Sequence, residues 1–468
     1  MEIQSTSRIL RIALFVLLSF LSFKPIRDDT LLHIKIGEYL VQHLQAPPPQ
    51  YYTYLKPDIP WEPHLWGSQI LFYLLYKLGG FPLLRLLLPL ATFLLLCSTY
   101  YFAKSLKLPE TQQILISLCV FLLYVDRLRY RPHIFSAILL YFLLGYFLFY
   151  ANQLRRRQIA LLSTMTILWI NLHSAAVFFP ALLWAYTFGR YLQGKNYTTY
   201  LLLSLCLTLC LCITPRPFSI LVYILRPKTT LAYIGEYKSL WEYAIDAWNQ
   251  SPDRLWVIAL AIMICLLYLW KLPQNFKTHL PLYLLSLPLL YLSLRYGRFL
   301  YLLGIPLTIT LAKSSLSSQK STYFLVALLL LAAIQLKGPD AYFAWKHPSQ
   351  HIDPHLYPIQ AVQFIKKYQL QGRVFTDNLQ WSSFAIFYLH PQCKFFTDTR
   401  FIYCGLRPIL ETQEIAQGGE NQHQLFRLYH IQYLLVSHQF RFAPHEHKHW
   451  TLIYQDKLSR IFRRRFSL

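Results

Sequence analysis

The chain has 468 residues, of which 55% are hydrophobic and 14% charged, and it carries a formal net charge of +24. This composition is too apolar for an ordinary soluble protein and predicts a membrane protein. The positive charge does not indicate a nucleic-acid-binding protein, because the basic residues are dispersed in short segments between apolar runs, where membrane topology and anionic lipid head groups account for them.

Apolar runs of the length of transmembrane helices follow one another up to about residue 340. They cover residues 9–23, 66–81, 82–103, 112–125, 134–150, 159–172, 174–191, 199–214, 254–270, 280–294, 299–312 and 322–336. The first run is not followed by a small-residue cleavage site, which indicates a retained span rather than a signal peptide. The predicted fold class is mainly α, a polytopic transmembrane helical bundle.

The basic segments predict the sidedness of this bundle. Arg155-Arg156-Arg157 and the other basic short loops share the cytoplasmic side when the chain crosses the membrane about 11 times. The run 66–81, which ends in Gly79-Gly80, is then a partial span or half of a hairpin; the alternative is that 112–125 does not cross. The extracytoplasmic segments are then 24–65, 126–133, 171–173, 215–253, 295–298 and everything after residue 340.

The pattern changes after residue 340. Short strands are predicted at 373–377, 393–400, 431–437, 450–456 and 459–465. Helical segments such as 358–369 and 407–430 lie between them. We therefore expect a small extracytoplasmic α/β domain at 339–468. It follows a transmembrane domain at 1–338, which contains the first extracytoplasmic loop, 24–65.

The cysteines give no indication of a metal site. Six of the eight lie inside apolar runs, where cysteine behaves as a small hydrophobic residue, and no C-x-x-C spacing occurs. Cys393 and Cys404 lie in the polar C-terminal part and could form a disulfide if that part is extracytoplasmic. The sequence leaves this pairing open.

The first loop places two carboxylates directly after the first apolar run. Asp28 and Asp29 precede the stretch HIKIGEYLVQHL, which can form an amphipathic helix in the membrane interface. Its lipid-facing residues would be Ile34, Leu40, Val41 and Leu44. Taken alone, the two acids are most simply helix caps.

Other polar residues occur at the ends of apolar runs that share the predicted extracytoplasmic side. They are Arg131, His133, Asn171, His173, Arg295 and Arg298. Each could separately snorkel to the head groups or bind phospholipid. Several cations and imidazoles gathered on one face of a membrane protein nevertheless favour a functional site.

Several short motifs occur in a particular order along the chain. They are Asp29-x-x-x-His33-x-x-x-Gly37, Trp61-x-x-His64-x-Trp66, Leu78-Gly79-Gly80, Arg131-Pro132-His133, Trp169-x-Asn171-x-His173, and Pro391 followed by Asp398-x-Arg400. In this order they resemble a family of bacterial polytopic proteins that is similar to the GT-C class of membrane glycosyltransferases. The resemblance spans nearly the whole chain.

The resemblance implies a lipid-linked sugar donor, such as a polyprenyl-phosphate sugar, used at the outer face of the membrane. It also implies that an acid of the first loop, here Asp29 with Asp28 beside it, acts as the catalytic base or helps to bind a divalent cation. Arginine binds phosphate in a bidentate manner, so Arg131, Arg295 and Arg298 are expected to contact the lipid phosphate. The remaining expected substrate-binding residues are His33, His64, His133, Asn171 and His173.

The functional hypothesis is a glycosyltransferase of the inner (plasma) membrane that acts on an envelope glycan, lipid or protein. A transporter or flippase for a lipid-linked glycan, and a non-catalytic envelope scaffold, are the alternatives. Inverted repeats would favour the transporter, and the sequence has no clear internal repeat. Asp398 and Arg400 could bind the acceptor, although a structural ion pair is the favoured interpretation.

Overall fold

The computed structural model describes residues 2–56, 64–218, 237–312, 319–400 and 405–465. The chain divides into two compact units. The first consists of Met1–Lys24, Arg85–Ile224 and Ile234–Pro348, and the second of Pro25–Leu84, Leu225–Tyr233 and Ser349–Leu468. Trp61, which belongs to one of the motifs, and Cys404, whose pairing with Cys393 the sequence leaves open, lie outside the described residues.

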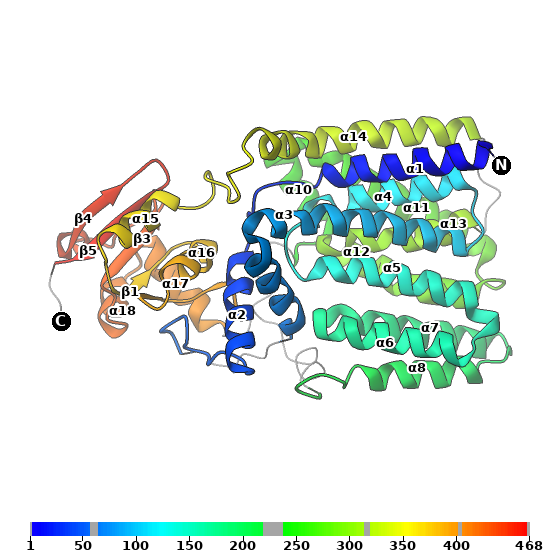
Figure 1. Cartoon of the computed structure of the whole chain (residues 1–468), viewed down its shortest axis with the longest axis horizontal. Coiled ribbons are helices and arrows are strands. Elements are labelled where there is room, and N and C mark those ends of the chain that lie inside the picture. Colours follow the sequence, from blue (N-terminus) through cyan, green and yellow to red (C-terminus); the bar gives the residue numbers. More distant parts are fainter. Residues whose placement is uncertain (1, 57–63, 219–236, 313–318, 401–404, 466–468) are drawn as a thin grey trace. The chain divides into compact units, whose positions relative to one another are not determined.

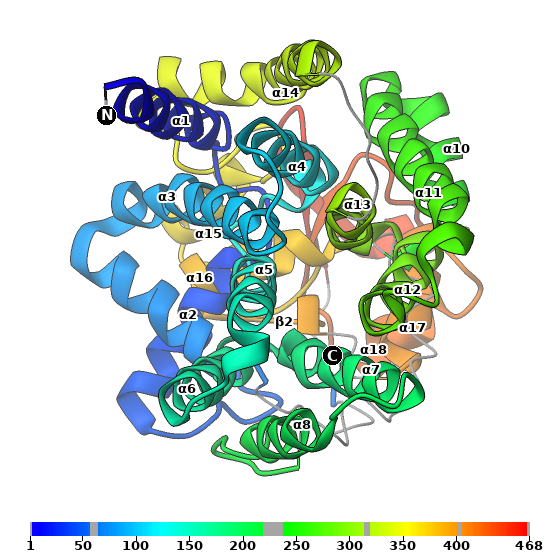
Figure 2. The same ribbon diagram turned by 90° about the vertical axis from the view of Figure 1, so that its right-hand side faces the viewer.

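The first unit is helical. Its helices are α1 (Glu2–Phe20), the later part of α3 (Trp66–Ser105), α4 (Glu110–Leu123), α5 (His133–Tyr150), α6 (Arg156–Leu172), α7 (Phe178–Leu192), α8 (Thr198–Cys210), α10 (Leu240–Gln250), α11 (Leu255–Asn275), α12 (Leu280–Arg295), α13 (Gly304–Ala312) and α14 (Gln319–Lys346). Most of the long helices run side by side (Figure 1), and Figure 2 views them nearly along their axes. The predicted apolar runs therefore form the predicted helical bundle.

Short 3-10 helices connect some of these long helices. Those that matter for the site are η1 (Val125–Arg127), η3 (Ser174–Val177) and η7 (Gly297–Leu303). They lie in or next to the short segments that the sequence places between apolar runs, so they carry polar side chains at the ends of the bundle.

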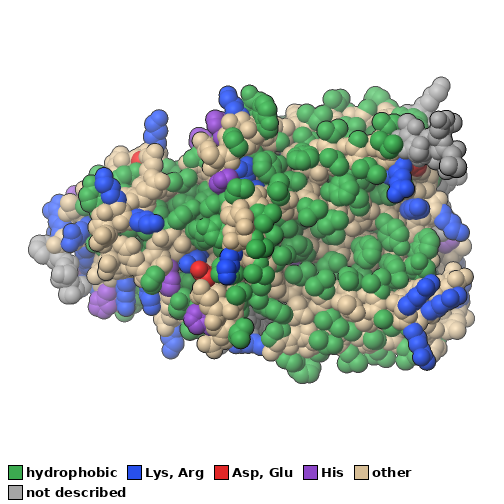
Figure 3. All heavy atoms as spheres, viewed as in Figure 1, with side chains coloured by type: hydrophobic (Ala, Val, Ile, Leu, Met, Phe, Trp, Pro, Cys, Tyr) green, Lys and Arg blue, Asp and Glu red, His purple; other side chains and the backbone are tan. Residues whose placement is uncertain are grey.

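Among the described residues, four helical stretches are long and apolar enough to cross a membrane. They are Trp66–Ser105, His133–Gln153, Pro252–Leu272 and Thr322–Lys346. Large hydrophobic side chains such as Leu202, Leu266 and Phe324 are exposed on the bundle, and Figure 3 shows hydrophobic side chains over much of the face in view. Such a surface is unfavourable in water and suited to lipid, as predicted.

The second unit contains a five-stranded mixed sheet with the strand order β2-β1-β3-β5-β4. The strands are β1 (Gly372–Phe375), β2 (Cys393–Phe395), β3 (Tyr433–Ser437), β4 (Trp450–Gln455) and β5 (Ser459–Arg464). β1 runs parallel to β2 and β3, whereas β5 runs antiparallel to β3 and β4. Each strand lies in or overlaps a stretch that the sequence predicts as a strand.

The helices of the second unit are α2 (Thr30–His43), the first part of α3, α15 (Ile359–Lys367), α16 (Leu379–Leu389), α17 (Arg407–Gln417) and α18 (Gln422–Leu428). The core of the sheet domain is aromatic and aliphatic and includes Phe375, Phe396 and Trp450. Residues of the first loop belong to this unit. Ile26 forms a β-bridge with Ile352, and Thr53 forms one with Phe395.

The predicted interfacial orientation of α2 is wrong. Ile34 and Leu40, expected to face lipid, are only 1% and 8% exposed and lie inside the second unit, whereas Leu44 is exposed at the end of the helix. The packing of α2 against α3 explains the difference. A Cβ atom at Gly37 would lie 2.0 Å from the backbone oxygen of Gln69, so only glycine permits this close approach.

Helix α3 is interrupted where the sequence predicts a hairpin. Gly79 (φ −147°, ψ 20°) and Gly80 (φ 61°, ψ −156°) leave the helical conformation. The positive φ of Gly80 is strained for a residue with a side chain. The two halves of α3 are thus separate helical segments; whether 66–81 is a partial span or half of a hairpin stays a prediction.

Candidate functional site

The first unit contains a pocket with a volume of about 190 Å³. Its lining comes from η1 and the residues after it, from α10 and its flanking segments, and from η7. The lining residues are Leu123, Asp126, Arg127, Arg129, Lys238, Tyr243, Asp246, Ala247, Ser251, Arg254, Gly297, Arg298 and Leu300. Apart from Leu123, Arg254 and Leu300, the lining residues belong to the segments 126–133, 215–253 and 295–298, which the predicted topology places on one side of the membrane.

The lining of this pocket is basic, with five cationic and two acidic side chains. Lys238 Nζ lies 2.5 Å from Asp246 Oδ2, and Arg254 Nε lies 3.5 Å from Asp126 Oδ1. Two carboxylates cannot balance five cations, so the pocket has a net positive charge. A pocket of this kind attracts anions such as phosphate.

Arg298 is held at the pocket by aromatic neighbours. The carbon of its guanidinium group lies 4.4 Å from the centre of the Tyr237 ring and 5.5 Å from that of Phe299. The backbone amide of Gly297 donates a 2.7 Å hydrogen bond to the carbonyl oxygen of Lys238. This bond joins the start of η7 to the segment before α10, so both contribute cations to the same pocket.

His133 and Arg131 lie close to the pocket but are not part of its lining. His133 is buried at the start of α5, and its Nε2 lies 2.7 Å from the carbonyl oxygen of Arg127. The backbone amide of Arg131 donates to the carbonyl oxygen of Arg129 at 2.8 Å. The predicted Arg-Pro-His motif therefore supports the turn that brings Arg127 and Arg129 to the pocket.

His173 is fixed by α5 at the end of α6. Ser136 Oγ lies 2.7 Å from His173 Nδ1 and accepts a 2.8 Å hydrogen bond from Trp169 Nε1. The backbone amide of Ala175 donates to the same imidazole nitrogen at 3.3 Å. Nδ1 is therefore the acceptor nitrogen of His173, and Nε2 carries the proton of the neutral ring.

Asn171 and Arg295 have contacts outside the pocket lining. Asn171 Nδ2 donates to the carbonyl oxygens of Ile167 and Ile213, and thereby links the ends of α6 and α8. Arg295, in the last turn of α12, lies 5.1 Å from the centre of the Tyr296 ring. Of the substrate-binding residues predicted in this unit, Arg298 alone lines the described pocket.

Asp29, His33 and Gly37 form one face of α2 in the second unit, because they are spaced four residues apart. Asp29 is the N-cap residue of α2, but its carboxylate makes no capping hydrogen bond. Its Oδ1 lies 3.8 Å from His33 Nε2, and both side chains are buried. His33 Nδ1 lies 3.3 Å from Gln69 Nε2 on α3, at the point where Gly37 allows close packing.

The neighbouring Asp28 has a different environment. Thr30 Oγ1 donates to its carboxylate, and the hydroxyl of Tyr357 donates to its backbone carbonyl oxygen at 2.9 Å. These bonds hold the chain just before α2. His64, the other predicted residue of the first loop, lies half-buried in the turn before α3.

Asp398 and Arg400 form a buried ion pair, as favoured from the sequence. Arg400 Nε lies 3.0 Å from both carboxylate oxygens of Asp398, and Nη2 lies 2.6 Å from Oδ2. The guanidinium carbon lies 5.4 Å from the centre of the Tyr52 ring, which belongs to the first loop. The pair is thus bonded within itself and also contacts the first loop through Tyr52.

No protein-family model and no curated protein matches the sequence. Solved structures do match. The archaeal oligosaccharyltransferase AglB from Archaeoglobus fulgidus, in complex with an inhibitory peptide and a dolichol-phosphate, aligns with 93% of this chain and 70% of its own, with 10% identity and a TM-score of 0.62. ArnT from Cupriavidus metallidurans in the apo state aligns with 98% of both chains, with 11% identity and a TM-score of 0.54.

The chain has a GT-C-like fold. The arabinofuranosyltransferase AftD from Mycobacteria is also similar, with a TM-score of 0.51 and 15% identity over 97% of this chain, although this chain covers only 39% of AftD. The resemblance predicted from the motifs is thus confirmed at the level of the fold. Together with the apolar helices, it identifies a multi-pass membrane protein.

Within this GT-C-like fold, the sequence missed most of the basic pocket. Arg127, Arg129, Lys238 and Arg254 were not predicted as site residues, although the first three lie in segments assigned to the same side as Arg298 and Arg254 directly follows such a segment. Basic residues at the ends of apolar runs are common in membrane proteins. The sequence could have indicated these residues if the basic residues of all segments on the predicted extracytoplasmic side had been grouped. The motifs marked only the supporting histidine, His133.

Proposed function

We propose that this protein is an integral membrane glycosyltransferase of the GT-C type. It transfers a sugar from a polyprenyl-phosphate-linked donor to an acceptor of the cell envelope. The observation that carries the proposal is the basic pocket at η1, α10 and η7, in a chain whose GT-C-like fold extends over almost its whole length.

The positive charge of the pocket is suited to binding the anionic phosphate group of a donor. Arg127 and Arg298 belong to different segments, so their guanidinium groups can approach a phosphate from two directions. Guanidinium stays protonated and binds phosphate oxygens in pairs. AglB has been solved with a dolichol-phosphate, and we infer that a lipid phosphate of the same chemical class occupies the pocket of this chain.

Asp29 is the proposed catalytic carboxylate. In the transfer step, the acceptor hydroxyl oxygen forms the new bond to the anomeric carbon, the bond from that carbon to the phosphate oxygen breaks, and the lipid phosphate leaves with the bonding electrons. Asp29 would take the proton of the hydroxyl group. Asp29 and His33 could also give two ligands to a divalent cation, which would neutralise the leaving phosphate.

The proposed topology has about 11 spans, with the C-terminal α/β domain, 339–468, outside the inner (plasma) membrane and the transmembrane domain at 1–338. Basic short loops then face the cytoplasm. The first loop, 24–65, and the pocket segments share the outer side, where a translocated lipid-linked sugar is available to an envelope acceptor.

The proposal is tested by incubating the purified full-length protein with radiolabelled polyprenyl-phosphate sugars and envelope extract from cells that lack it. We expect a labelled glycan or glycolipid, and a large loss of donor binding in Arg298→Gln. Arg157→Gln, which removes an exposed arginine in the first turn of α6, is the matched control. Donor binding or flipping without any transfer product would contradict the enzyme and favour a transporter.

A further inference from the structure

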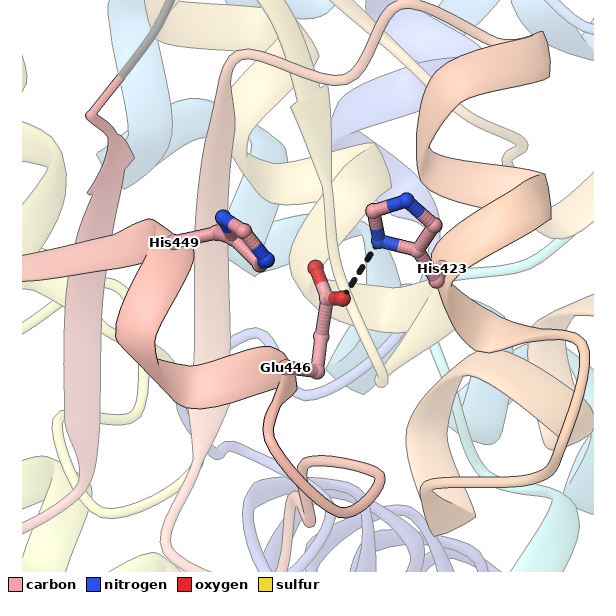
Figure 4. Close-up of side chains that lie close together, drawn as sticks. All are labelled: His423, Glu446 and His449. Atoms are coloured by element: carbon pink, nitrogen blue, oxygen red, sulfur yellow. Dashed lines mark hydrogen bonds and ion pairs between the residues drawn. The ribbon is translucent and has the colours of Figure 1, made fainter.

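Two histidines and a glutamate converge in the C-terminal part of the second unit. His423 lies on α18, and Glu446 and His449 lie on the 3-10 helix η9 (Glu446–His449) that precedes β4. Their ligand atoms all lie within 4.8 Å of one another. Figure 4 shows the carboxylate of Glu446 between the two imidazole rings. No motif predicted this cluster, because its members are separated in the sequence and only the fold brings them together.

The carboxylate at the centre of the cluster is positioned by the surrounding core. Glu446 is 3% exposed, and its Oε1 accepts a 3.0 Å hydrogen bond from Trp450 Nε1. Its Oε2 lies 2.7 Å from His423 Nδ1. One oxygen is thus fixed by the indole, and the other is directed at the histidines.

The two histidines reach this carboxylate from different elements. The rings of His423 and His449 have centres 5.6 Å apart. The side chain of His423 is 47% exposed, and that of His449 is half-buried. The neighbouring His447 is exposed on the same short helix. The cluster therefore lies at the surface of the domain, and the carboxylate of Glu446 is its buried member.

We infer that His423, Glu446 and His449 form a binding site for a zinc ion, distinct from any ion held by the first loop. Two imidazoles and one carboxylate are a ligand set typical of Zn²⁺, with a fourth position left for water. Ca²⁺ and Mg²⁺ prefer sites made of oxygen atoms. The exposed side of the histidines gives water access to the fourth position.

The geometry requires only small side-chain movements. Zn–N and Zn–O bonds of about 2.0 to 2.2 Å in a tetrahedral site place ligand atoms a little over 3 Å apart. The Oε2 to Nδ1 distance of 2.7 Å would lengthen slightly, and His449 would approach. His423 is exposed enough to rotate, whereas Glu446 remains fixed by Trp450.

An ion pair of His423 with Glu446 is the simpler interpretation, but it leaves the position of His449 unexplained. Arg464 also interacts electrostatically with Glu446. Its guanidinium donates a 3.0 Å hydrogen bond to the carbonyl oxygen of Phe426 and lies near the Trp450 ring. The positive charge of Arg464 lowers the affinity of the cluster for a cation. The two interpretations differ in their response to added metal: a zinc site binds Zn²⁺, whereas an ion pair alone does not.

The test is a Zn²⁺ titration of the full-length protein in detergent, purified with a tag that contains no histidine and freed of metal with a chelator. The Asp29→Asn background removes the first-loop carboxylate as a competing ligand. We expect one Zn²⁺ per chain and, with Co²⁺, the visible absorption of a four-coordinate site. Failure of the proposed glycosyltransferase function would leave this result unchanged.

Variants identify the ligands. His423→Ala and His449→Ala are each expected to weaken Zn²⁺ binding by more than about 100-fold, because the loss of a residue that merely supports a ligand already costs up to that factor. His447→Ala is the matched control and should bind Zn²⁺ like the parent protein. Unchanged thermal unfolding in the absence of metal shows that each variant is folded.

Three results would overturn the zinc site. They are no stoichiometric binding by the parent protein, normal binding by both His423→Ala and His449→Ala, or an equal loss of binding in His447→Ala. The first would leave the ion pair as the role of His423 and Glu446. The last would indicate unspecific binding to the histidine-rich segment 445–449.

Discussion

The imidazole of His133 is bonded to the backbone of Arg127, with Nε2 lying 2.7 Å from the carbonyl oxygen. Because a carbonyl oxygen only accepts, Nε2 carries the proton. His133 begins α5 and Arg127 ends η1, so this bond fixes the turn that brings Arg127 into the basic pocket. A histidine of the predicted motif therefore acts as a positioning residue for an arginine that the motifs did not mark.

His133→Ala is expected to raise KM for the lipid-linked donor by roughly fivefold with a smaller change in kcat, because it removes one hydrogen bond worth about 1 kcal/mol. His133→Gln, whose amide can donate to the same carbonyl oxygen, should restore part of the affinity. The measurement is initial transfer rate against donor concentration. Equal KM values for the parent and His133→Ala would show that the bond does not position Arg127 for the donor.

Asp29→Asn and Asp28→Asn should have different effects. Asp29 is the proposed base, and an amide of the same size cannot take the proton of the acceptor hydroxyl, so Asp29→Asn is expected to abolish transfer while leaving the protein folded. Asp28 is bonded to Thr30 and Tyr357 in the structure. The Tyr357 bond goes to the backbone and the amide oxygen of Asp28→Asn can still accept from Thr30, so this variant should lower stability by less than about 1 kcal/mol and retain transfer.

The two aspartate variants are compared by thermal unfolding and by single-turnover transfer with bound donor. The comparison removes differences in donor affinity, so the chemical step alone is measured. Full transfer by Asp29→Asn would exclude Asp29 as the base. If Asp28→Asn lost transfer and Asp29→Asn kept it, Asp28 would be the catalytic base.

Gly37→Ala should destabilise the second unit, although alanine usually favours a helix over glycine. The new methyl group would lie 2.0 Å from the Gln69 backbone oxygen and 2.9 Å from Tyr73 Cβ. We expect a loss of about 1 to 3 kcal/mol, as for other overpacked sites. Thermal unfolding in detergent measures it, with Gln42→Ala on the exposed side of α2 as the control. A Tm equal to that of the control would mean that α2 and α3 separate easily.

Apolar periodicity predicted the helices and strands well, because run length and alternation depend on local sequence. The stretches 431–437 and 459–465 became β3 and β5 almost residue for residue. The position of α2 could not be predicted in the same way. Its apolar residues suit a lipid surface and a protein core equally, and the close approach at Gly37 depends on a partner about thirty residues away.

The candidate site was harder to predict than the fold. Arg298 was recognised because it shares the predicted extracytoplasmic side with other cations and imidazoles at the ends of apolar runs, whereas Lys238 and Arg254 resemble ordinary loop residues in the sequence. Their common pocket depends on the packing of α10 and η7, which no local pattern encodes. The pair Asp398 and Arg400 was predictable because it is formed within two residues of one segment.

Breaking the Asp398–Arg400 pair should cost about 3 to 5 kcal/mol, because it leaves a buried guanidinium without its carboxylate. The two side chains are 3% and 8% exposed, respectively. Asp398→Asn should therefore lower Tm strongly. Glu38→Gln is the control, since it breaks the more exposed pair with Lys35, which is worth less than about 1 kcal/mol. Similar Tm values for both variants would show that the buried pair adds little to stability.

The pH dependence of stability should include a contribution from His390. Burial lowers the pKa of this histidine, and the nearby charges of Lys35 and Lys394 lower it further, against the opposing effect of the Tyr51 carbonyl oxygen and Glu38. The unfolded chain then binds a proton more readily than the folded protein. The free energy of unfolding therefore falls as the pH decreases through the ordinary histidine pKa of about 6.5, by at most about 1.4 kcal/mol per pH unit for this one group.

Replacing His390 with glutamine should flatten this part of the profile. The amide of His390→Gln can still donate to the Tyr51 carbonyl oxygen, which His390 Nε2 approaches at 3.1 Å. Thermal unfolding midpoints between about pH 5.5 and 7.5, the range around the ordinary histidine pKa, provide the measurement. His447→Gln, at an exposed histidine, is the matched control. If His390→Gln kept the full pH dependence of the parent protein, the proton uptake would have to belong to other groups.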